Sequence, residues 1–435
     1  MEFSIDQVLG MAPDASSAAA GRKLAAVKSW QNLGRSAEAI WGECQGSAVY
    51  QVRCSLADLS YKCSCPSRKF PCKHVLGLLL VATGTPSALN EGEPPDWVVE
   101  WLGKREAAAR QRETRRANAG APVDAAAQAK RAEKRSERVA AGVEQLQRWL
   151  SDLARNGLAA LETQPASFWE AEAARLVDAQ APGLAGRIRG LASVPRATPD
   201  WPRRLAEQLG RVALAAHAFN RLDSIAPLLR EDVRQFVGWT LKEDEVEAVG
   251  ERVDDAWIVI GQTIDDEERI RVQRNWLFGD RSRRTALVLQ FAAGAAPFAE
   301  TFVPGTQFTA EIVYYPSAWP QRARVSVRRG ESVAAIERLP GSPSCTAFLD
   351  EVTAALVRQP WLDRFPAVLS GVVPAVDGER WQIQDSAGGA LPLTGRRHWR
   401  LLALSGGAAV DLAGEWNGES LWPLGVAVAG KFHAL

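Results

Sequence analysis

Cys63-Ser-Cys65-Pro-Ser-Arg-Lys-Phe-Pro-Cys72-Lys-His74 joins a CxC pair to a CxH pair across six residues. Three thiolates and one imidazole make a complete tetrahedral shell for Zn²⁺. Residues i and i+2 of an extended strand lie on the same face, so Cys63 and Cys65 can bind one ion from one side. Cys72 and His74 then complete the shell where a helix begins. The spacing predicts one structural zinc ion, because no ligand position is left for water.

Two alternatives compete with a metal site. Free cysteines often pack as small hydrophobic side chains, but these lie beside four cations, a poor setting for burial: Lys62, Arg68, Lys69 and Lys73. Zinc bound to three thiolates carries a net negative charge, which these cations offset while favouring the thiolate forms. A disulfide is disfavoured because Cys63 and Cys65 lie too close for easy bridging and nothing indicates export.

The flanking residues extend this pattern through Trp41-Gly-Glu-Cys-Gln-Gly-Ser47 and Tyr50-Gln-Val52. Over about residues 41–83 the chain resembles the SWIM zinc finger, a CxC…CxH motif on a strand–strand–helix unit, as found in bacterial SWIM proteins of similar length. It departs from that block at Ala48-Val49, where relatives often carry a Gly-rich loop with proline. The resemblance implies a zinc-stabilised module that binds DNA or proteins. It also implies an accessory subunit encoded beside MoxR-class AAA ATPases and von Willebrand A proteins.

Length and composition set wider limits. A chain of 435 residues typically holds about three domains. The net charge of +1 gives no overall field that would attract nucleic acid or membrane. The N-terminus lacks a basic segment followed by an apolar one, and the longest apolar run, Val75 to Val81, is too short to span a bilayer. We therefore expect a cytoplasmic location and no membrane partner.

The pattern of apolar residues predicts an α+β fold in successive regions. Residues 1–103 form an N-terminal region around the finger, and residues 104–136 form a basic Ala/Arg-rich linker. Residues 137–249 form a helical domain, and residues 250–435 form an antiparallel β-rich region of one or two units. The linker has two interpretations: a basic arm for nucleic acid or an acidic partner, or a solvated spacer.

The spacing of apolar residues, and the capping and turn residues between them, predict individual helices and strands. Near the finger we expect a helix from Ala18 to Trp30, capped by Asp14 or Ser16, and strands at 38–43, 48–57 and 59–63. A stripe at Val139, Val143, Leu146, Leu150 and Leu153 predicts a helix between Ser136 and Gly157. Further helices are expected after Asp200 and Pro227, and His217 is expected to be a packed or rim residue.

Beyond residue 250 the period changes to two. Five strands are expected in an antiparallel meander, with an exposed acidic turn at Asp265-Asp266. A helical segment from Thr346 to Leu369 precedes short strands near Trp381–Ile383, Trp399–Leu404 and Trp416–Val428, with a hairpin turn at Asn417-Gly418. Cys345 is expected in a loop, and Cys44 and Cys54 are expected as buried strand residues, although pairing or alternate ligation stays open.

The sequence contains no convincing enzyme motif. The chain has no GxxxxGK[ST] loop, strand-linked GxGxxG, GxSxG elbow or HExxH, so we expect a non-enzymatic binding or adaptor protein. Partner contacts are expected at Arg68, Lys69 and Lys73, on and beside the loop between the two ligand pairs. With Arg53 and Lys62 these cations are numerous enough for phosphate contacts, so direct DNA binding through the finger and linker is the alternative. The near-zero net charge favours a protein partner.

Overall fold

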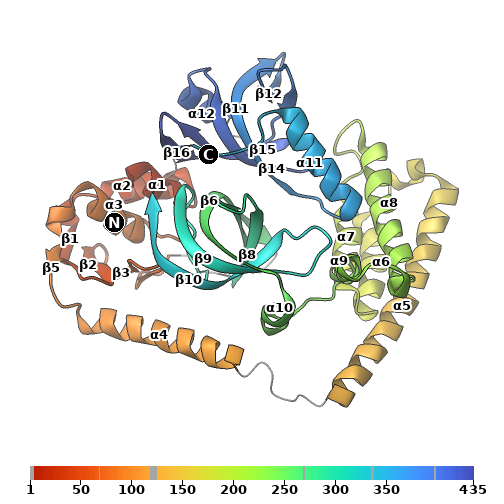
Figure 1. Cartoon of the computed structure of the whole chain (residues 1–435), viewed down its shortest axis with the longest axis horizontal. Helices are drawn as coiled ribbons and strands as arrows, with labels where there is room; N and C mark the ends of the chain where they lie inside the picture. The colour runs from red at the N-terminus through yellow and green to blue at the C-terminus, as the bar shows by residue number, and fades with distance from the viewer. Residues whose placement is uncertain are drawn as a thin grey trace.

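The computed structural model describes residues 4–435 apart from 68, 118–124, 268–269, 295, 297, 335–337 and 396–397. In Figure 1 the N-terminal unit lies at one side of a central β-barrel, a helix bundle lies at the other side, and a C-terminal sheet lies above. The long helices α4 and α5 run along the outer edge between the N-terminal unit and the bundle. The predicted α+β class, with a finger first, helices in the middle and antiparallel sheets last, is confirmed.

The N-terminal unit packs short helices on a mostly antiparallel sheet with strand order β4-β3-β2-β1-β5. Its elements are α1 (Ile5–Gly10), α2 (Ala15–Lys23), β1 (Trp30–Arg35), β2 (Ala39–Gln45), β3 (Val49–Ser55), β4 (Tyr61–Cys63), α3 (Lys73–Gly84) and β5 (Asn90–Glu91). Asp14 caps α2 by accepting a hydrogen bond from the Ser17 amide, as predicted. The expected helix to Trp30 is wrong in its second half, because Trp30 begins β1 and buries its ring against α3 residues in the finger core.

Two helices occupy most of the segment expected to be a linker. Helix α4 spans Asp96–Ala117 and helix α5 spans Ala125–Asn156. The start of α5 is eleven residues before the Ser136 cap that the sequence suggested. Alanine and arginine have high helix propensity, which supports a helix even where no apolar face is available. The segment Gly120-Ala-Pro122, whose composition predicts disorder, lies outside the described residues.

The middle of the chain is a helix bundle. Helix α5 packs with α6 (Ala166–Asp178), α7 (Pro182–Leu191), α8 (Trp201–Phe219) and α9 (Pro227–Val237), with short 3₁₀ turns between some of them. The predicted stripe supplies Val139, Val143, Leu146 and Leu153 to the buried core. Gly157 follows the end of α5 with a φ of 80°, the left-handed conformation that suits glycine. His217 is exposed at the bundle surface, as expected.

The central unit is a closed five-stranded barrel. After α10 (Glu243–Val249) come β6 (Arg252–Glu267), β7 (Ile270–Gly279), β8 (Thr285–Ala293), β9 (Thr306–Tyr314) and β10 (Arg322–Ala334). The expected meander covers β6, β7 and β8, but β10 closes the barrel by pairing parallel to β8 and antiparallel to β9. Its five strands and closed form resemble the OB-fold, a five-stranded Greek-key barrel. Asp265 and Asp266 lie within β6, opposite Val272 and Arg271, so the acidic turn predicted there is wrong.

The C-terminal unit is a six-stranded antiparallel sheet with order β13-β12-β11-β14-β15-β16. Its elements are α11 (Cys345–Arg358), β11 (Phe365–Asp377), β12 (Arg380–Gln384), β13 (Ala390–Pro392), α12 (His398–Ser405), β14 (Val410–Trp416), β15 (Leu421–Val428) and β16 (Lys431–Ala434). Three expectations are corrected. Cys345 begins α11 rather than lying in a loop, residues 365–369 are strand, and Trp399–Leu404 is helix α12. The Asn417-Gly418 turn does connect β14 to β15.

The N-terminal unit is attached to the barrel. Val303, in the segment between β8 and β9, is part of the buried core around α3. The Gln7 side chain donates a hydrogen bond to the Gly305 carbonyl at 3.1 Å in the interior of this contact. Among the described residues, no helix is long and apolar enough to cross a membrane.

Candidate metal centre

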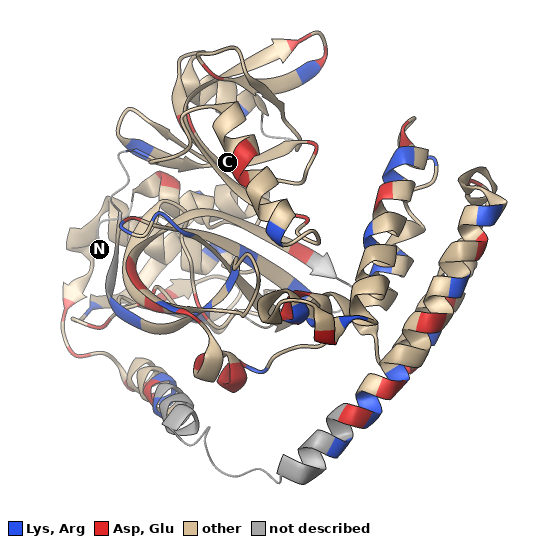
Figure 2. Cartoon of the chain, turned by 45° about the vertical axis from the view of Figure 1, so that its right-hand side comes forward, with Lys and Arg blue, Asp and Glu red and all other residues tan. Residues whose placement is uncertain are grey.

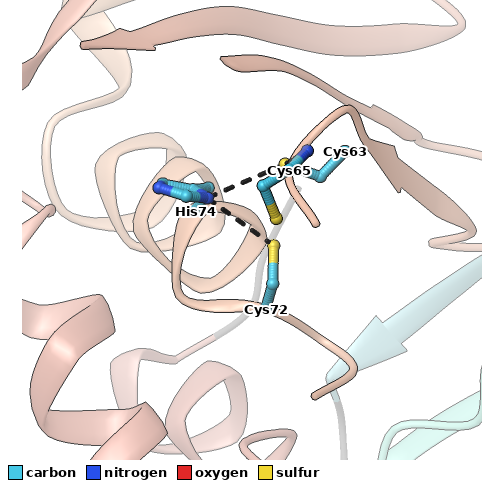
Figure 3. A group of neighbouring side chains, drawn as sticks. All are labelled: Cys63, Cys65, Cys72 and His74. Atoms are coloured by element: carbon cyan, nitrogen blue, oxygen red, sulfur yellow. Dashed lines mark hydrogen bonds between the residues drawn. The ribbon is translucent and has the colours of Figure 1, made fainter. Parts of the chain in front are cut away.

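The four predicted ligands come from two backbone segments that the finger fold brings together. Cys63 ends β4, and Cys65 follows it in the next turn. Cys72 is the N-cap residue of α3, and His74 lies in the first turn of that helix. Figure 3 shows the three cysteines and the histidine around a common centre. The sequence spacing therefore identified the cluster, including the helix start at which Cys72 and His74 complete it.

The distances fit a tetrahedral zinc ion. The Nδ1 atom of His74 lies 3.8 Å from the Cys63 sulfur and 4.0 Å from the Cys72 sulfur. All four ligand atoms lie within 4.8 Å of one another. Zinc with Zn–S bonds of about 2.3 Å and Zn–N bonds of about 2.1 Å separates its tetrahedral ligands by about 3.6–3.8 Å. A modest contraction of the cluster would complete the shell, with Nδ1 as the histidine ligand.

Local backbone contacts hold the cysteine pair in place. Val52 of β3 pairs with Cys63 of β4, and the Ser64 amide then donates to the Gln51 carbonyl at 3.1 Å. The Ser64 hydroxyl accepts from the Gln51 amide at 2.9 Å, which continues the pairing one residue past the strand. The chain is thus extended through Ser64. This is the conformation in which Cys63 and Cys65 share a face.

The three thiols also shift one another's pKa values. A hydrogen bond from the Cys63 thiol to the Cys72 sulfur lowers the pKa of Cys72 and raises that of Cys63. Burial raises the pKa of Cys65. One thiolate is therefore favoured by its neighbours alone, and a bound cation supplies the charge that keeps the other two ionised.

Tyr50 and Arg53 of β3 form the next layer. The Tyr50 ring lies 4.7 Å from the His74 ring and limits its rotation. The Arg53 side chain is buried, with its guanidinium 5.1 Å from the Trp97 ring and 5.9 Å from the Trp101 ring. Burial lowers the pKa of Arg53, and the nearby Cys63 thiolate opposes that effect. This guanidinium therefore lies where it offsets the negative charge of a three-thiolate zinc site.

Arg53 was expected among surface cations, and its role beside the metal was missed. The available signal was the i, i+4 spacing of Trp97 and Trp101, which puts both rings on one helical face. An aromatic pair of that kind suits a guanidinium. Nothing in the sequence placed this helix against β3, so the contact was not predictable from local pattern.

The residues expected to contact a partner have different environments. The Lys69 ammonium pairs with the Asp14 carboxylate at 2.7 Å and lies 3.3 Å from the Ser16 hydroxyl. That ammonium holds the pKa of Asp14 far below its usual range. Lys73 is exposed in the first turn of α3. Arg68 lies outside the described residues.

The remaining cysteines do not join the site. Cys44, Cys54 and Cys345 are free thiols and are buried. Cys44 faces Tyr50 and Cys54 faces Ile40 across the β2–β3 pairing, so the two are not opposite each other. The expectation of buried strand cysteines is confirmed for both, and neither pairing nor alternate ligation is present.

Comparison with known families agrees with this geometry. The family model of the SWIM zinc finger matches residues 50–82, which hold all four ligands. The model of the SWIM-associated four-helix bundle domain matches residues 134–237, from within α5 to the end of α9. No curated protein and no solved structure matches the chain. The chain therefore contains a SWIM zinc finger with a Cys₃His site suited to one zinc ion, together with the helix bundle that accompanies such fingers.

Proposed function

We propose that this protein is a non-enzymatic binding or adaptor subunit whose partner is another protein. The non-enzymatic part rests on the sequence, which holds none of the nucleotide-binding, hydrolase or metalloprotease motifs considered above. Zinc in a closed four-ligand shell serves to fold the finger rather than to activate water. The finger is then a rigid element, and little ordering entropy is lost when a rigid surface binds.

The choice of a protein partner rests on one observation: cations of the finger already form ion pairs or aromatic contacts within the chain. Lys69 is paired with Asp14, and Arg53 is buried beneath Trp97 and Trp101. Arg105 pairs with Asp58 next to the finger. Binding to DNA phosphates needs several cations free on one face. Among the described residues of the finger, the exposed cations Lys62 and Lys73 make a small set for that purpose.

The barrel surface argues in the same direction. OB-fold barrels bind oligonucleotides on the outer face of their second and third strands. Here the corresponding residues Trp276 and Phe278 of β7 and Leu287 of β8 pack against Val368 and Leu424 of the C-terminal sheet. That face is covered by the chain itself and offers little room for a nucleic-acid strand.

Charges on helix α5 are mixed. Figure 2 shows basic and acidic residues interspersed along α5. Its described part from Glu133 onward holds Lys134, Arg135, Arg138, Arg148 and Arg155 beside Glu133, Glu137, Glu144 and Asp152. A helix of this kind is typical of a solvated surface, and a nucleic-acid arm would carry one sign of charge.

The finer assignment is an accessory subunit that works with a MoxR-class AAA ATPase or a von Willebrand A protein in the cytoplasm. It rests on the resemblance of the finger to those of bacterial SWIM proteins. Direct DNA binding is the competing outcome.

The test is affinity capture with the tagged full-length chain from its native cell extract, with and without nuclease. Purified protein is titrated in parallel with duplex DNA at several salt concentrations. We expect a protein partner whose capture resists nuclease and no DNA binding at micromolar concentrations in physiological salt. DNA binding of micromolar strength or better that is weakened by Lys62→Glu with Lys73→Glu would overturn the proposal, since those two cations are free to contact phosphate.

A further inference from the structure

A cavity of about 600 Å³ lies where the finger meets an open end of the barrel. The finger contributes Tyr61, Phe70 and Pro71, and the barrel contributes Gln262, Ile264 and Gln273. The Cys63 and Cys72 ligands also reach its wall. The metal centre therefore shapes one side of this cavity. Mouths of β-barrels and domain boundaries are preferred positions for binding sites.

Aromatic side chains form much of the wall. Phe70 of the finger lines it together with Phe298 and Phe302 from the segment between β8 and β9. The Arg271 guanidinium lies 5.7 Å from the Phe70 ring and 4.9 Å from the Phe298 ring, so it links the finger side to the barrel side. Ile264 adds an aliphatic surface that is 40% exposed. Such walls suit one large apolar side chain.

Two glutamine amides at the barrel end leave one donor and one acceptor unused. Gln273 is 6% exposed, and its Oε1 accepts from Asn275 at 3.3 Å, whereas its Nε2 has no partner among the described residues. Gln262 donates through Nε2 to Asn275 at 2.7 Å and to the Phe302 carbonyl at 2.9 Å, and its Oε1 has no described partner. Neither atom is fully enclosed by the described protein, and both glutamines line the cavity, so these two groups are available to a ligand. A peptide group offers the complementary acceptor and donor.

The rim is basic on the finger side. Lys62 is exposed with no ion-pair partner among the described residues, and Lys104 is exposed with only a loose pairing to Glu100 at 3.6 Å. Arg105 lies beside them and pairs with Asp58. Among the described residues that line the cavity, Glu300 is the one carboxylate. The rim thus favours a ligand with negative charges near its ends.

We propose that this cavity binds an extended segment of a partner protein in which a large apolar side chain is flanked by acidic residues. The apolar side chain enters between Phe70 and Phe302. A peptide carbonyl of the segment accepts a hydrogen bond from Gln273 Nε2, and a peptide N–H donates one to Gln262 Oε1. The flanking carboxylates approach Lys62 and Lys104. This inference rests on the proposed adaptor function and names the surface and the chemistry through which it operates.

The test selects a phage-displayed library of random peptides on the purified full-length protein. A selected peptide is then titrated by fluorescence anisotropy. We expect enriched sequences with one aromatic or large aliphatic residue next to Asp or Glu. Ile264→Glu places a carboxylate at the mouth and weakens binding roughly tenfold or more, because like charges then face each other. Ile270→Glu is the matched control, since Ile270 is 48% exposed on the neighbouring strand and does not line the cavity.

A second pair of variants tests the rim. Lys62→Glu is expected to weaken peptide binding severalfold. Lys28→Glu, which changes an exposed cation of the same unit that does not line the cavity, is expected to leave it unchanged. Enrichment of no peptide, or equal binding by Ile264→Glu and Ile270→Glu, overturns this site. Capture of a protein partner from extract by wild type and Ile264→Glu alike overturns the site but leaves the adaptor function standing. If peptides are selected but the extract yields no protein partner, the cavity binds peptides as proposed and the adaptor function is contradicted.

Discussion

Trp276 of β7 donates its indole Nε1–H to the Glu415 carboxylate of β14 at 2.8 Å. Both side chains are almost completely buried between the barrel and the C-terminal sheet. The other oxygen of Glu415 pairs with Arg364, so the buried charge is compensated on both sides. Because the surrounding residues Ile258, Val368 and Leu424 belong to one apolar cluster, the two β units share an interior.

Trp276→Phe should therefore weaken the contact between the two units. It removes the hydrogen bond and leaves a void beside Glu415, at a cost of about 2–4 kcal/mol in the free energy of unfolding. The measurement is chemical denaturation followed by far-UV circular dichroism. Trp422→Phe is the control: Trp422 is 42% exposed on β15 of the C-terminal sheet, and its change should cost less than about 0.5 kcal/mol. Equal losses for the two variants would contradict this role for Trp276.

The metal site was predictable because its information is local. Cys63, Cys65, Cys72 and His74 lie within one short stretch, and ligand type with spacing determines the chemistry. The amphipathic stripe that includes Val139 and Leu146 was equally local, since a 3.6-residue period is a property of one helix.

Features that depend on distant segments were missed. The parallel pairing of β10 with β8 closes the barrel, and no turn motif connects those strands. Trp399–Leu404 was expected to be a strand because a short apolar run fits either period. Leu401 is buried and Trp399 is 72% exposed, so it is the packing of one helical face that favours the helix over the strand. Arg53 contacts Trp97 because helix α4 packs against β3, and that packing is a tertiary effect.

Metal content gives a direct prediction. Purified wild-type protein should contain one zinc ion per chain, because the cluster supplies four ligands and no more. Cys72→Ser should lose the ion and loosen the finger, since structural zinc contributes on the order of 10 kcal/mol to the unit that holds it. Elemental analysis by mass spectrometry measures the metal. Cys345→Ala, a buried cysteine outside the cluster, should keep one zinc; iron in place of zinc, or no metal in wild type, would refute the assignment.

Asp232 predicts a pH dependence of stability at the contact between the bundle and the barrel. It accepts a hydrogen bond from the Ala318 amide at 2.8 Å and lies buried at the end of the bundle. Burial raises the pKa of Asp232 to about 6 from an ordinary value of 3.8. Between these two values the folded state binds more protons than the unfolded state, so this group's contribution falls as pH rises from about 4 to about 6.

Asp232→Asn removes that titration and retains an acceptor for Ala318. We expect it to gain stability over wild type above pH 6, by at most about 3 kcal/mol, and to gain little below pH 4. Denaturation at a series of pH values measures the difference. Asp223→Asn, an exposed carboxylate of the same bundle, should leave the pH profile unchanged. A difference between Asp232→Asn and wild type that does not vary with pH would contradict the raised pKa.

The last prediction concerns the charge of the metal site. The Arg53 guanidinium is held under Trp97 and Trp101, and it interacts with the Cys63 thiolate. Arg53→Met keeps the apolar length of the side chain and removes the charge. Zinc affinity should then fall about 10- to 100-fold, the range found for groups that support metal ligands. Competition with a chromophoric chelator measures that affinity. Arg53→Lys should recover part of it, because the charge returns without the planar group that stacks on the rings.

Arg105→Met is the matched control for that experiment. Arg105 lies 5.3 Å from the Trp101 ring and pairs with Asp58, so it shares the aromatic contact but is already neutralised by a carboxylate. It should change zinc affinity by less than threefold or so. If Arg53→Met and Arg105→Met weaken zinc equally, loss of packing around Trp101 explains both, and the electrostatic role of Arg53 is wrong. If only Arg53→Met weakens zinc and Arg53→Lys restores it in part, the buried charge is what the three-thiolate site requires.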